Sequence, residues 1–253
     1  MESGDLNDAE FARELAERAG ALLLALRAEG SFSGRALGDE GDRRANQLIC
    51  AAIHRERPRD GLLSEESTDD GHRLKLSRVW VVDPLDGTRE YAEGRDDWAV
   101  HIGLSIDGVA AVGAVALPAM GQVLSSESPA PLGTMHHPPR MVVSRSRAPE
   151  LAMAVAAKLG AELVPMGSAG AKAMAVVRGE AEIYLHAGGQ YAWDNCAPAA
   201  VALAAGLHAS RIDGSALTYN LRDPSIPDLL ICRRELAPAA IDEIRQIGWN
   251  NQR

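Results

Sequence analysis

Two aspartates three residues apart mark the segment Asp83-Pro84-Leu85-Asp86-Gly87-Thr88, which directly follows the apolar run at 79–82. A carboxylate at the carboxyl end of a buried strand stands where the sites of layered α/β proteins tend to open. Pro84 stops the strand, so the turn after it can bring both carboxylates and the Leu85 carbonyl onto hard cations such as Mg²⁺. Composition leaves a second interpretation open, because Asp, Pro and Gly are also the commonest residues of an ordinary turn.

Three other acidic positions could join these aspartates. Glu65 lies upstream in a Glu-Glu pair, Asp194 lies in the segment Trp193-Asp194-Asn195-Cys196-Ala197-Pro198, and Asp42 continues the apolar stripe of a predicted helix. Each has a structural alternative: a solvated acidic loop, a helix N-cap and a favourable charge at a helix N-terminus, respectively. Carboxylates held together repel one another and shift their pKa values unless cations neutralise them, so the set as a whole predicts a metal site.

The two segments at 83–88 and 193–198 resemble, in this order, the two signatures of the inositol monophosphatase superfamily. The upstream pair Glu65-Glu66 and the residues Gly167-Ser168 and Gly179 also resemble that family, so the similarity runs from about residue 42 to residue 217. Trp-Asp-Asn-Cys-Ala-Pro is closer to the form found in 3′(2′),5′-bisphosphate nucleotidases of the CysQ type than to that of inositol monophosphatases. The resemblance therefore favours a nucleotide substrate.

The resemblance also implies a role for individual residues. It implies that Asp42 and Thr88 orient and deprotonate the attacking water. The metal ligands implied, for two or three Mg²⁺ ions, are Glu65, Asp83, the Leu85 carbonyl, Asp86 and Asp194. The substrate-binding residues implied are Glu65, Leu85, Asp86, Gly87, Thr88, Ser168, Lys172 and Asp194. Lys172 could meet a second phosphate, and the alternative is a lysine on the surface of a helix.

Two neighbouring segments are less informative. Ser144-Arg145-Ser146-Arg147 resembles the Ser-Arg-Ser-His of CysQ-type enzymes, and a solvated strand end is the alternative. The predicted loop at 30–41 is where relatives often carry a lysine, and none is present here. We therefore expect no lysine contact to phosphate from that loop.

The reaction implied is the magnesium-dependent removal of the 3′-phosphate of 3′-phosphoadenosine 5′-phosphate by metal-activated water attack, which gives AMP and phosphate. Relatives are commonly inhibited by lithium, so Li⁺ is an expected inhibitor. An inositol monophosphatase or a broad sugar-type monophosphatase is the alternative within this class. A metal-dependent ligand-binding protein without turnover is the alternative from another class.

The charge and composition of the chain limit its partners. A formal net charge of −9 over 253 residues opposes binding to nucleic-acid polymers or anionic membranes. The small phosphorylated substrate that the resemblance implies is compatible with this charge if bound cations reverse the local field. No run approaches the roughly 18 apolar residues of a membrane span, and the start at 1–5 is acidic, unlike a secretory signal. We expect a cytoplasmic protein without stable membrane insertion, as a monomer or a homodimer. Cys50, Cys196 and Cys232 have neither disulfide nor zinc spacing.

The elements that must position these residues follow from apolar periodicity. Leu15, Ala19, Leu22 and Leu26 predict a helix that begins after Asn7 and ends at Gly30, and a second helix is predicted from near Asp42 to before Pro58. Later helices are expected at 149–159, 168–177, 196–205 and 238–247, and strands at 79–82, 100–106, 109–117, 122–124, 141–143, 162–165, 182–185, 208–211 and 229–232.

The resemblance implies a layered α/β fold, the αβαβα sandwich of the inositol monophosphatase type. We expect residues 1–253 to form one catalytic unit of two halves, an N-terminal α+β half at 1–124 and a C-terminal α/β half at 141–253. The linker between them is expected at 125–140, because four prolines there oppose a packed helix or a central strand. The site should lie between the halves.

Overall fold

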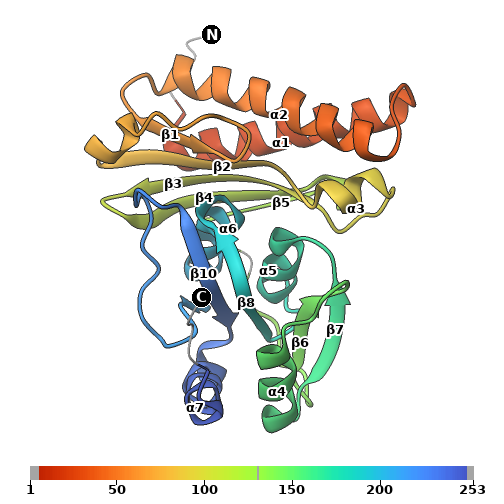
Figure 1. The fold of residues 1–253 in the computed structure, drawn as a ribbon, viewed down its shortest axis with the longest axis vertical. Coiled ribbons are helices and arrows are strands. Elements are labelled where there is room, and N and C mark those ends of the chain that lie inside the picture. Colours follow the sequence, from red (N-terminus) through yellow and green to blue (C-terminus); the bar gives the residue numbers. More distant parts are fainter. Residues whose placement is uncertain (1–5, 130, 250–253) are drawn as a thin grey trace.

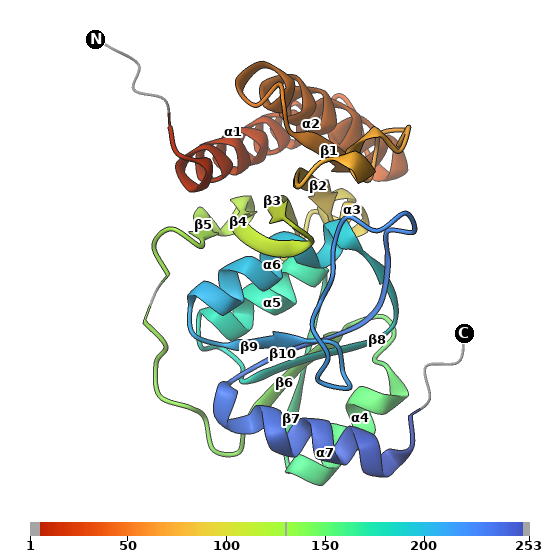
Figure 2. The ribbon, with the colours of Figure 1, turned by 90° about the vertical axis from the view of Figure 1, so that its left-hand side faces the viewer.

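Five layers of helices and sheets make up the computed structural model, which describes residues 6–129 and 131–249. Figures 1 and 2 show α1 and α2 above a first sheet, α5 and α6 between this sheet and a second one, and α4 and α7 beneath. The expected αβαβα sandwich is confirmed. Within the described residues no helix is long and apolar enough to cross a membrane. The acidic start at 1–5 lies outside the described residues.

The first helix, α1 (Asp8–Glu29), begins and ends where the sequence predicts. The Asn7 side chain accepts the backbone N–H groups of Ala9 and Glu10, and the Glu10 carboxylate accepts the Asn7 N–H, which completes a capping box. Gly30 ends the helix in the left-handed conformation (φ 68°). The apolar stripe of α1 is buried against the first sheet.

The second helix, α2 (Gly34–Glu56), is longer than predicted. We expected it to begin near Asp42, but Asp42 lies inside it and is 7% exposed. Three glycines made residues 34–41 resemble a loop in sequence, but two of them, Gly38 and Gly41, are required by close packing inside the helix. A Cβ at Gly38 would lie 2.6 Å from Cγ2 of Thr88, and one at Gly41 would lie 3.1 Å from Leu85. The helix thus passes directly over the first signature segment.

The first sheet has the strand order β1-β2-β3-β4-β5, with β1 parallel to β2 and the remaining pairs antiparallel. The pairing of β2 with β3 is irregular between Asp83 and Asp86: Asp83 lies opposite His101, and Asp86 lies opposite Ala99. The signature segment is therefore a bulge in β2, and a bulge can redirect side chains locally. The bounds are β1 (Gly61–Ser64), β2 (Arg78–Asp86), α3 (Thr88–Ala92), β3 (Ala99–Ile106), β4 (Val109–Leu117) and β5 (Gln122–Ser125).

The second sheet has the order β7-β6-β8-β10-β9; β6 is parallel to β7 and β8, and β10 is antiparallel to β8 and β9. Its elements are β6 (Arg140–Ser144), α4 (Glu150–Leu159), β7 (Glu162–Met166), α5 (Ala169–Val177), β8 (Ile183–Tyr191), α6 (Ala192–Ala204), β9 (His208–Ser210), β10 (Ser225–Cys232) and α7 (Ala237–Ile247). Three 3₁₀ turns lie at His72–Lys75, Pro118–Met120 and Arg234–Leu236.

Three predicted boundaries among these elements are wrong, and the first is the start of β10, which lies at Ser225 and not at Leu229. Strand β8 continues past 185 to Tyr191, because β10 pairs with it there although the sequence His-Ala-Gly-Gly-Gln-Tyr has no apolar run. Helix α6 begins at Ala192 rather than at Cys196, so Pro198 lies inside the helix. Asp194 therefore lies in the first turn of α6 and does not precede it.

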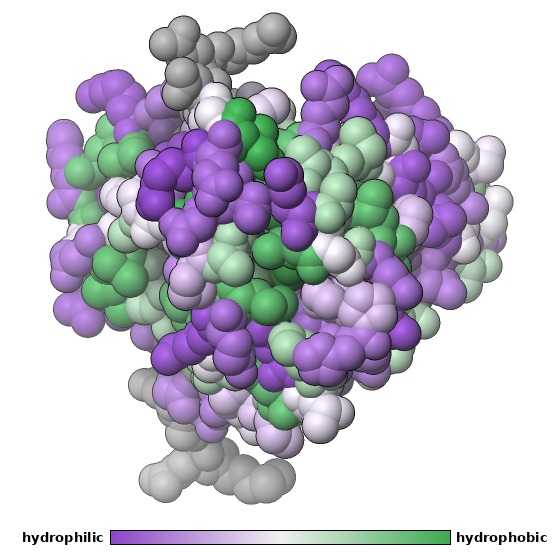
Figure 3. Space-filling model, turned by 90° about the horizontal axis from the view of Figure 1, so that it is seen from below, coloured by the Kyte–Doolittle hydropathy of each residue, from purple (hydrophilic) through white to green (hydrophobic). Residues whose placement is uncertain are grey.

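The segment between β5 and β6 has no helix or strand among its described residues, and Ala130 within it is not described. The division into two halves joined by a linker stays a prediction. Figure 3 shows the molecule from below, the end formed by α4 and α7, where apolar residues gather near the middle among hydrophilic ones. Met153 of α4 and Ile247 of α7 are exposed. Whether the chain forms a homodimer also stays a prediction.

Candidate active site and metal centre

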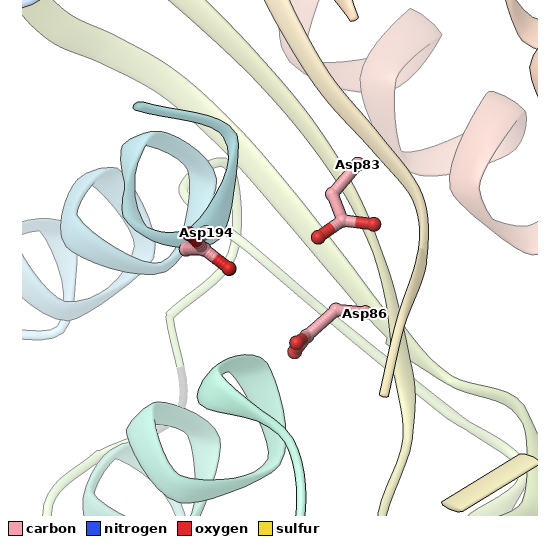
Figure 4. Close-up of side chains that lie close together, drawn as sticks. All are labelled: Asp83, Asp86 and Asp194. Carbon is pink, nitrogen blue, oxygen red and sulfur yellow. The ribbon is translucent and has the colours of Figure 1, made fainter. Parts of the chain in front are cut away.

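Three aspartates from distant parts of the sequence meet between the two sheets. Asp83, Asp86 and Asp194 each offer a carboxylate oxygen, and these oxygens lie within 4.8 Å of one another. Figure 4 shows Asp83 and Asp86 on β2 and Asp194 on α6 converging on one space beside the end of α5. Oxygen-rich clusters of this kind suit hard divalent cations.

Backbone groups hold the first two carboxylates in place. The N–H of Leu85 donates to Asp83 Oδ1 at 3.0 Å, within the bulge of β2. The first N–H groups of α5 donate to Asp86, from Ala169 to Oδ1 at 3.2 Å and from Gly170 to Oδ2 at 2.5 Å. A helix N-terminus favours a negative charge, so α5 stabilises Asp86 as a carboxylate.

The buried His101 links the two signature segments, although it is not among the site residues predicted from sequence. Its Nε2 lies 3.2 Å from Asp86 Oδ2, and its Nδ1 lies 3.0 Å from the Trp193 carbonyl oxygen. A carbonyl only accepts hydrogen bonds, so Nδ1 carries a hydrogen. Burial disfavours a charged ring, but the charge of Asp86 outweighs this and raises the pKa of His101. The one available signal was a polar residue inside the apolar run at 99–106.

The remaining acidic side chains lie close enough together to shift one another's pKa values. Burial, followed by the charge of Asp86, raises the pKa of Asp83 well above its usual range and that of Asp194 to about 6. Glu65 is exposed as a residue and lies outside the three-aspartate cluster, but desolvation of its carboxyl group, followed by the charge of Asp194, raises its pKa to about 7. Burial also acts to raise the pKa of Asp86, but His101, through its charge and its hydrogen bond, outweighs the effect of burial. The pKa of Asp86 is therefore lowered. Carboxyl groups crowded in this way ionise reluctantly because their negative charges repel one another. A bound divalent cation would neutralise these charges, so these residues fit a divalent metal site.

Asp42 and Thr88 lie together next to this cluster. The Thr88 hydroxyl is 3.1 Å from Asp42 Oδ2, to which it donates, and 3.2 Å from the carbonyl oxygen of Leu85. The other oxygen of Asp42, Oδ1, is buried without a hydrogen-bond partner. Burial, followed by the charge of Glu66, raises the pKa of Asp42 to about 8. Such a carboxyl group can accept and hold a proton near neutral pH.

Three predicted substrate-binding residues outside the acidic cluster, Gly87, Ser168 and Lys172, follow β2 or lie at the start of α5. Gly87 has φ 87°, in the left-handed region that favours glycine, and directly precedes the short helix α3, which starts at Thr88. The Ser168 hydroxyl caps α5 by accepting the N–H of Ala171 at 3.1 Å. Lys172 is 5% exposed, so the alternative of a surface lysine is wrong. Its ammonium group donates to the carbonyl oxygens of Gly167 and Ser168.

Of the two arginines after β6, Arg145 contacts acidic groups. Arg145 donates to Glu90 Oε1 at 2.8 Å and to Glu93 Oε2 at 2.6 Å, both in or next to α3. Arg147 is exposed. The contacts of Arg145 therefore connect the segment after β6 to α3, and contact of either arginine with phosphate stays a prediction.

Similarity to known proteins extends over nearly the whole chain. Residues 7–248 match the inositol monophosphatase family. The 3′-phosphoadenosine 5′-phosphate phosphatase of Mycobacterium leprae (strain TN) is 50% identical over 258 residues, covering 96% of this chain and 95% of that protein. The 3′(2′),5′-bisphosphate nucleotidase CysQ of Escherichia coli (strain K12) is 31% identical over 191 residues, covering 71% and 78%.

Solved structures agree on the fold. CysQ from Bacteroides thetaiotaomicron superposes with a TM-score of 0.76 at 24% identity, covering 90% of this chain and 97% of that one. Inositol monophosphatase II from Staphylococcus aureus MSSA476 superposes with a TM-score of 0.78 at 20% identity, covering 94% and 95%. At these identities the structural likeness concerns the fold alone.

Proposed function

The chain belongs to the inositol monophosphatase family, and on this premise we propose that it is a 3′(2′),5′-bisphosphate nucleotidase. Its reaction is the hydrolysis of the 3′-phosphate of 3′-phosphoadenosine 5′-phosphate to give AMP and phosphate. The observation that carries this proposal is the convergence of Asp83, Asp86 and Asp194 beside the Asp42–Thr88 pair. The nucleotide substrate is supported by 50% identity, over 96% of this chain, to a protein named for this activity.

The metal we propose is Mg²⁺, with two or three ions bound. Its ligands are the Leu85 carbonyl and the carboxylates of Glu65, Asp83, Asp86 and Asp194. When bound, the ions neutralise the phosphate, lower the pKa of water and stabilise the leaving oxygen. Metal dependence is a property of the family, and the orphaned oxygen and crowded carboxylates of this chain support it.

The residues of the chain itself supply positioning and proton transfer. Thr88 orients the attacking water through its hydroxyl, and Asp42 receives the proton through Thr88, since the two side chains are hydrogen-bonded. His101 and the N-terminus of α5 hold Asp86 in one orientation while the substrate is bound. The predicted contacts of Gly87, Ser168 and Lys172 with substrate remain part of the proposal.

The test is phosphate release by the purified chain with and without Mg²⁺. The substrates are 3′-phosphoadenosine 5′-phosphate, inositol 1-phosphate, fructose 1,6-bisphosphate and histidinol phosphate. We expect the adenosine bisphosphate to be preferred and Li⁺ to inhibit. A preference for inositol 1-phosphate would refute the nucleotide assignment, and no release from any substrate would refute the enzyme assignment.

A pair of aspartate variants separates the proposed site from general effects of charge. Asp86→Asn removes a proposed ligand, so we expect a loss of at least about 100-fold in kcat/KM, the upper end of what outer-shell residues of metal sites contribute. Asp242→Asn makes the same chemical change on the exposed surface of α7 and should leave activity unchanged. Full activity of Asp86→Asn would contradict its metal role.

A further inference from the structure

Two aromatic rings lie stacked where β8 passes into α6. The ring centroids of Tyr191 and Trp193 are 4.7 Å apart with an angle of 13° between the planes. Trp193 is partly buried and covers one face of the tyrosine ring, while Tyr191 is 48% exposed. The other face of the Tyr191 ring is therefore open to solvent.

The surroundings of this stack leave room for a ligand. Gly188 and Gly189, just before it, are exposed, and a Cβ added at either would meet no atom within 4 Å. The backbone beneath is fixed, because Tyr191 pairs with Ser225 of β10 and the Ala192 N–H donates to the Pro224 carbonyl at 2.8 Å. The stack is thus a rigid aromatic surface beside open space.

Both aromatic residues are tied to the acidic cluster through their backbones. The Tyr191 N–H donates to Asp194 Oδ2 at 2.6 Å, and the Trp193 carbonyl accepts from His101, which contacts Asp86. The aromatic surface is therefore held in a fixed relation to the groups proposed to bind metal. If the phosphate of a substrate binds at the acidic cluster, the remaining part of that substrate can reach this aromatic surface.

We propose that the open face of Tyr191, supported from behind by Trp193, is the stacking surface for the purine base of the substrate. This inference rests on the proposed nucleotidase function and names the residue that recognises the base. Every nucleobase presents a π-face, and a tyrosine already stacked on a second ring loses little freedom when a base stacks on it. Sugar phosphates without a base have no partner for this surface, so Tyr191 is a specificity residue for nucleotides over base-free phosphates.

The experiment compares Tyr191→Ala, Tyr191→Phe and the wild type. Because the backbone N–H remains in Tyr191→Ala, the hydrogen bond to Asp194 is kept while the ring is removed. Trp249→Ala is the matched control, since Trp249 is also exposed and follows α7, which contributes no residue to the proposed site. Initial rates give kcat and KM for 3′-phosphoadenosine 5′-phosphate, and calorimetry in Mg²⁺ gives the Kd of AMP and of ribose 5-phosphate, its base-free part.

We expect Tyr191→Ala to raise the KM for the bisphosphate and the Kd of AMP by roughly 5- to 100-fold, the range of base–aromatic stacking. The kcat should be unchanged, because stacking binds substrate and transition state equally. Tyr191→Phe and Trp249→Ala should behave as wild type, and ribose 5-phosphate should bind Tyr191→Ala and wild type equally.

Three outcomes would overturn the inference: an unchanged Kd of AMP, equal weakening of AMP and ribose 5-phosphate, or a fall in kcat alone. The second of these would mean that Tyr191 positions the acidic cluster instead. Failure of the wild type to hydrolyse the bisphosphate would refute the proposed function by itself, while the AMP measurement would still test the stacking surface.

Discussion

Substitution of Gly38 by alanine tests how closely α2 positions the proposed catalytic threonine. A Cβ at this position would lie 2.6 Å from Cγ2 of Thr88, whereas ordinary van der Waals contact begins at 3.4 Å. Relief of this clash needs a movement of about 0.8 Å, and the contacts most easily lost are those of the Thr88 hydroxyl to Asp42 and Leu85. Misplacement by about 1 Å can cost about 100-fold in rate. We therefore expect kcat to fall by about 100-fold in Gly38→Ala.

Stability should change much less than activity in this variant. Overpacking costs about 1–3 kcal/mol, but alanine favours an α-helix over glycine by about 1 kcal/mol, and Gly38 lies inside α2. The net loss of unfolding free energy is then at most about 2 kcal/mol. Urea unfolding followed by circular dichroism measures this loss, and phosphate release from 3′-phosphoadenosine 5′-phosphate measures kcat.

A second substitution makes the test specific. Thr88→Ser removes the methyl group with which the new Cβ collides and keeps the hydroxyl that contacts Asp42. The double variant Gly38→Ala/Thr88→Ser should therefore recover most of the activity of Thr88→Ser alone. If Gly38→Ala is fully active, or if the double variant is no better than Gly38→Ala, the packing of α2 does not position Thr88 and the reasoning is refuted.

Three further predictions concern the acidic cluster. Asp83→Asn keeps an oxygen that accepts the Leu85 N–H but removes a buried carboxyl group whose ionisation is disfavoured by burial and by the charge of Asp86, which raise its pKa, so the metal-free variant should have a higher Tm than the metal-free wild type. Calorimetric scans with EDTA and with Mg²⁺ check this, and a stabilisation by Mg²⁺ equal to that of wild type would contradict the ligand role. The pKa of Asp42 is raised to about 8 and that of Glu65 to about 7, so between about pH 4 and pH 8 these two groups bind more protons in the metal-free folded chain than in the unfolded chain, and the stability that they contribute is lost as the pH rises. A Tm in EDTA that climbs across this window would be the opposite of the expected result. His101→Phe keeps a flat buried ring but removes both nitrogen contacts, so Mg²⁺ affinity by calorimetry should fall roughly 10- to 100-fold, while His54→Phe on the exposed face of α2 should have no effect.

The signature segments could be predicted from sequence because their signals are local. The apolar run before Asp83 specifies a strand, although β2 continues through a bulge to Asp86 and does not stop at Pro84 as predicted, because β3 pairs with it on both sides of the bulge. Asn7 and Gly30 specify the ends of α1. The family resemblance then joined Asp83 to Asp194, which no periodicity could do. The αβαβα fold class followed from this resemblance and is confirmed.

Other features depend on contacts between residues far apart in sequence. Gly38 resembled a loop residue, although it is helical and packs against Thr88. The sequence left open whether Lys172 is a surface lysine, whereas in the structure its ammonium group is buried against two carbonyl oxygens at its own helix N-terminus. The residues that surround Gly38 and Lys172 belong to another element or to the end of a helix. The pattern of polar and apolar residues along the chain does not specify these contacts.

The sequence by itself determined the chemistry of this protein: which carboxylates are available, at what spacing, and beside which hydroxyl. Tertiary structure alone decided that His101 joins Asp86 to the Trp193 carbonyl and that Tyr191 presents an open ring next to Asp194. The physical reason is that burial and exposure are properties of packed elements. Whether a histidine in an apolar strand meets a carboxylate, or a tyrosine at a strand end faces water, depends on how β3, β8 and α6 pack against one another.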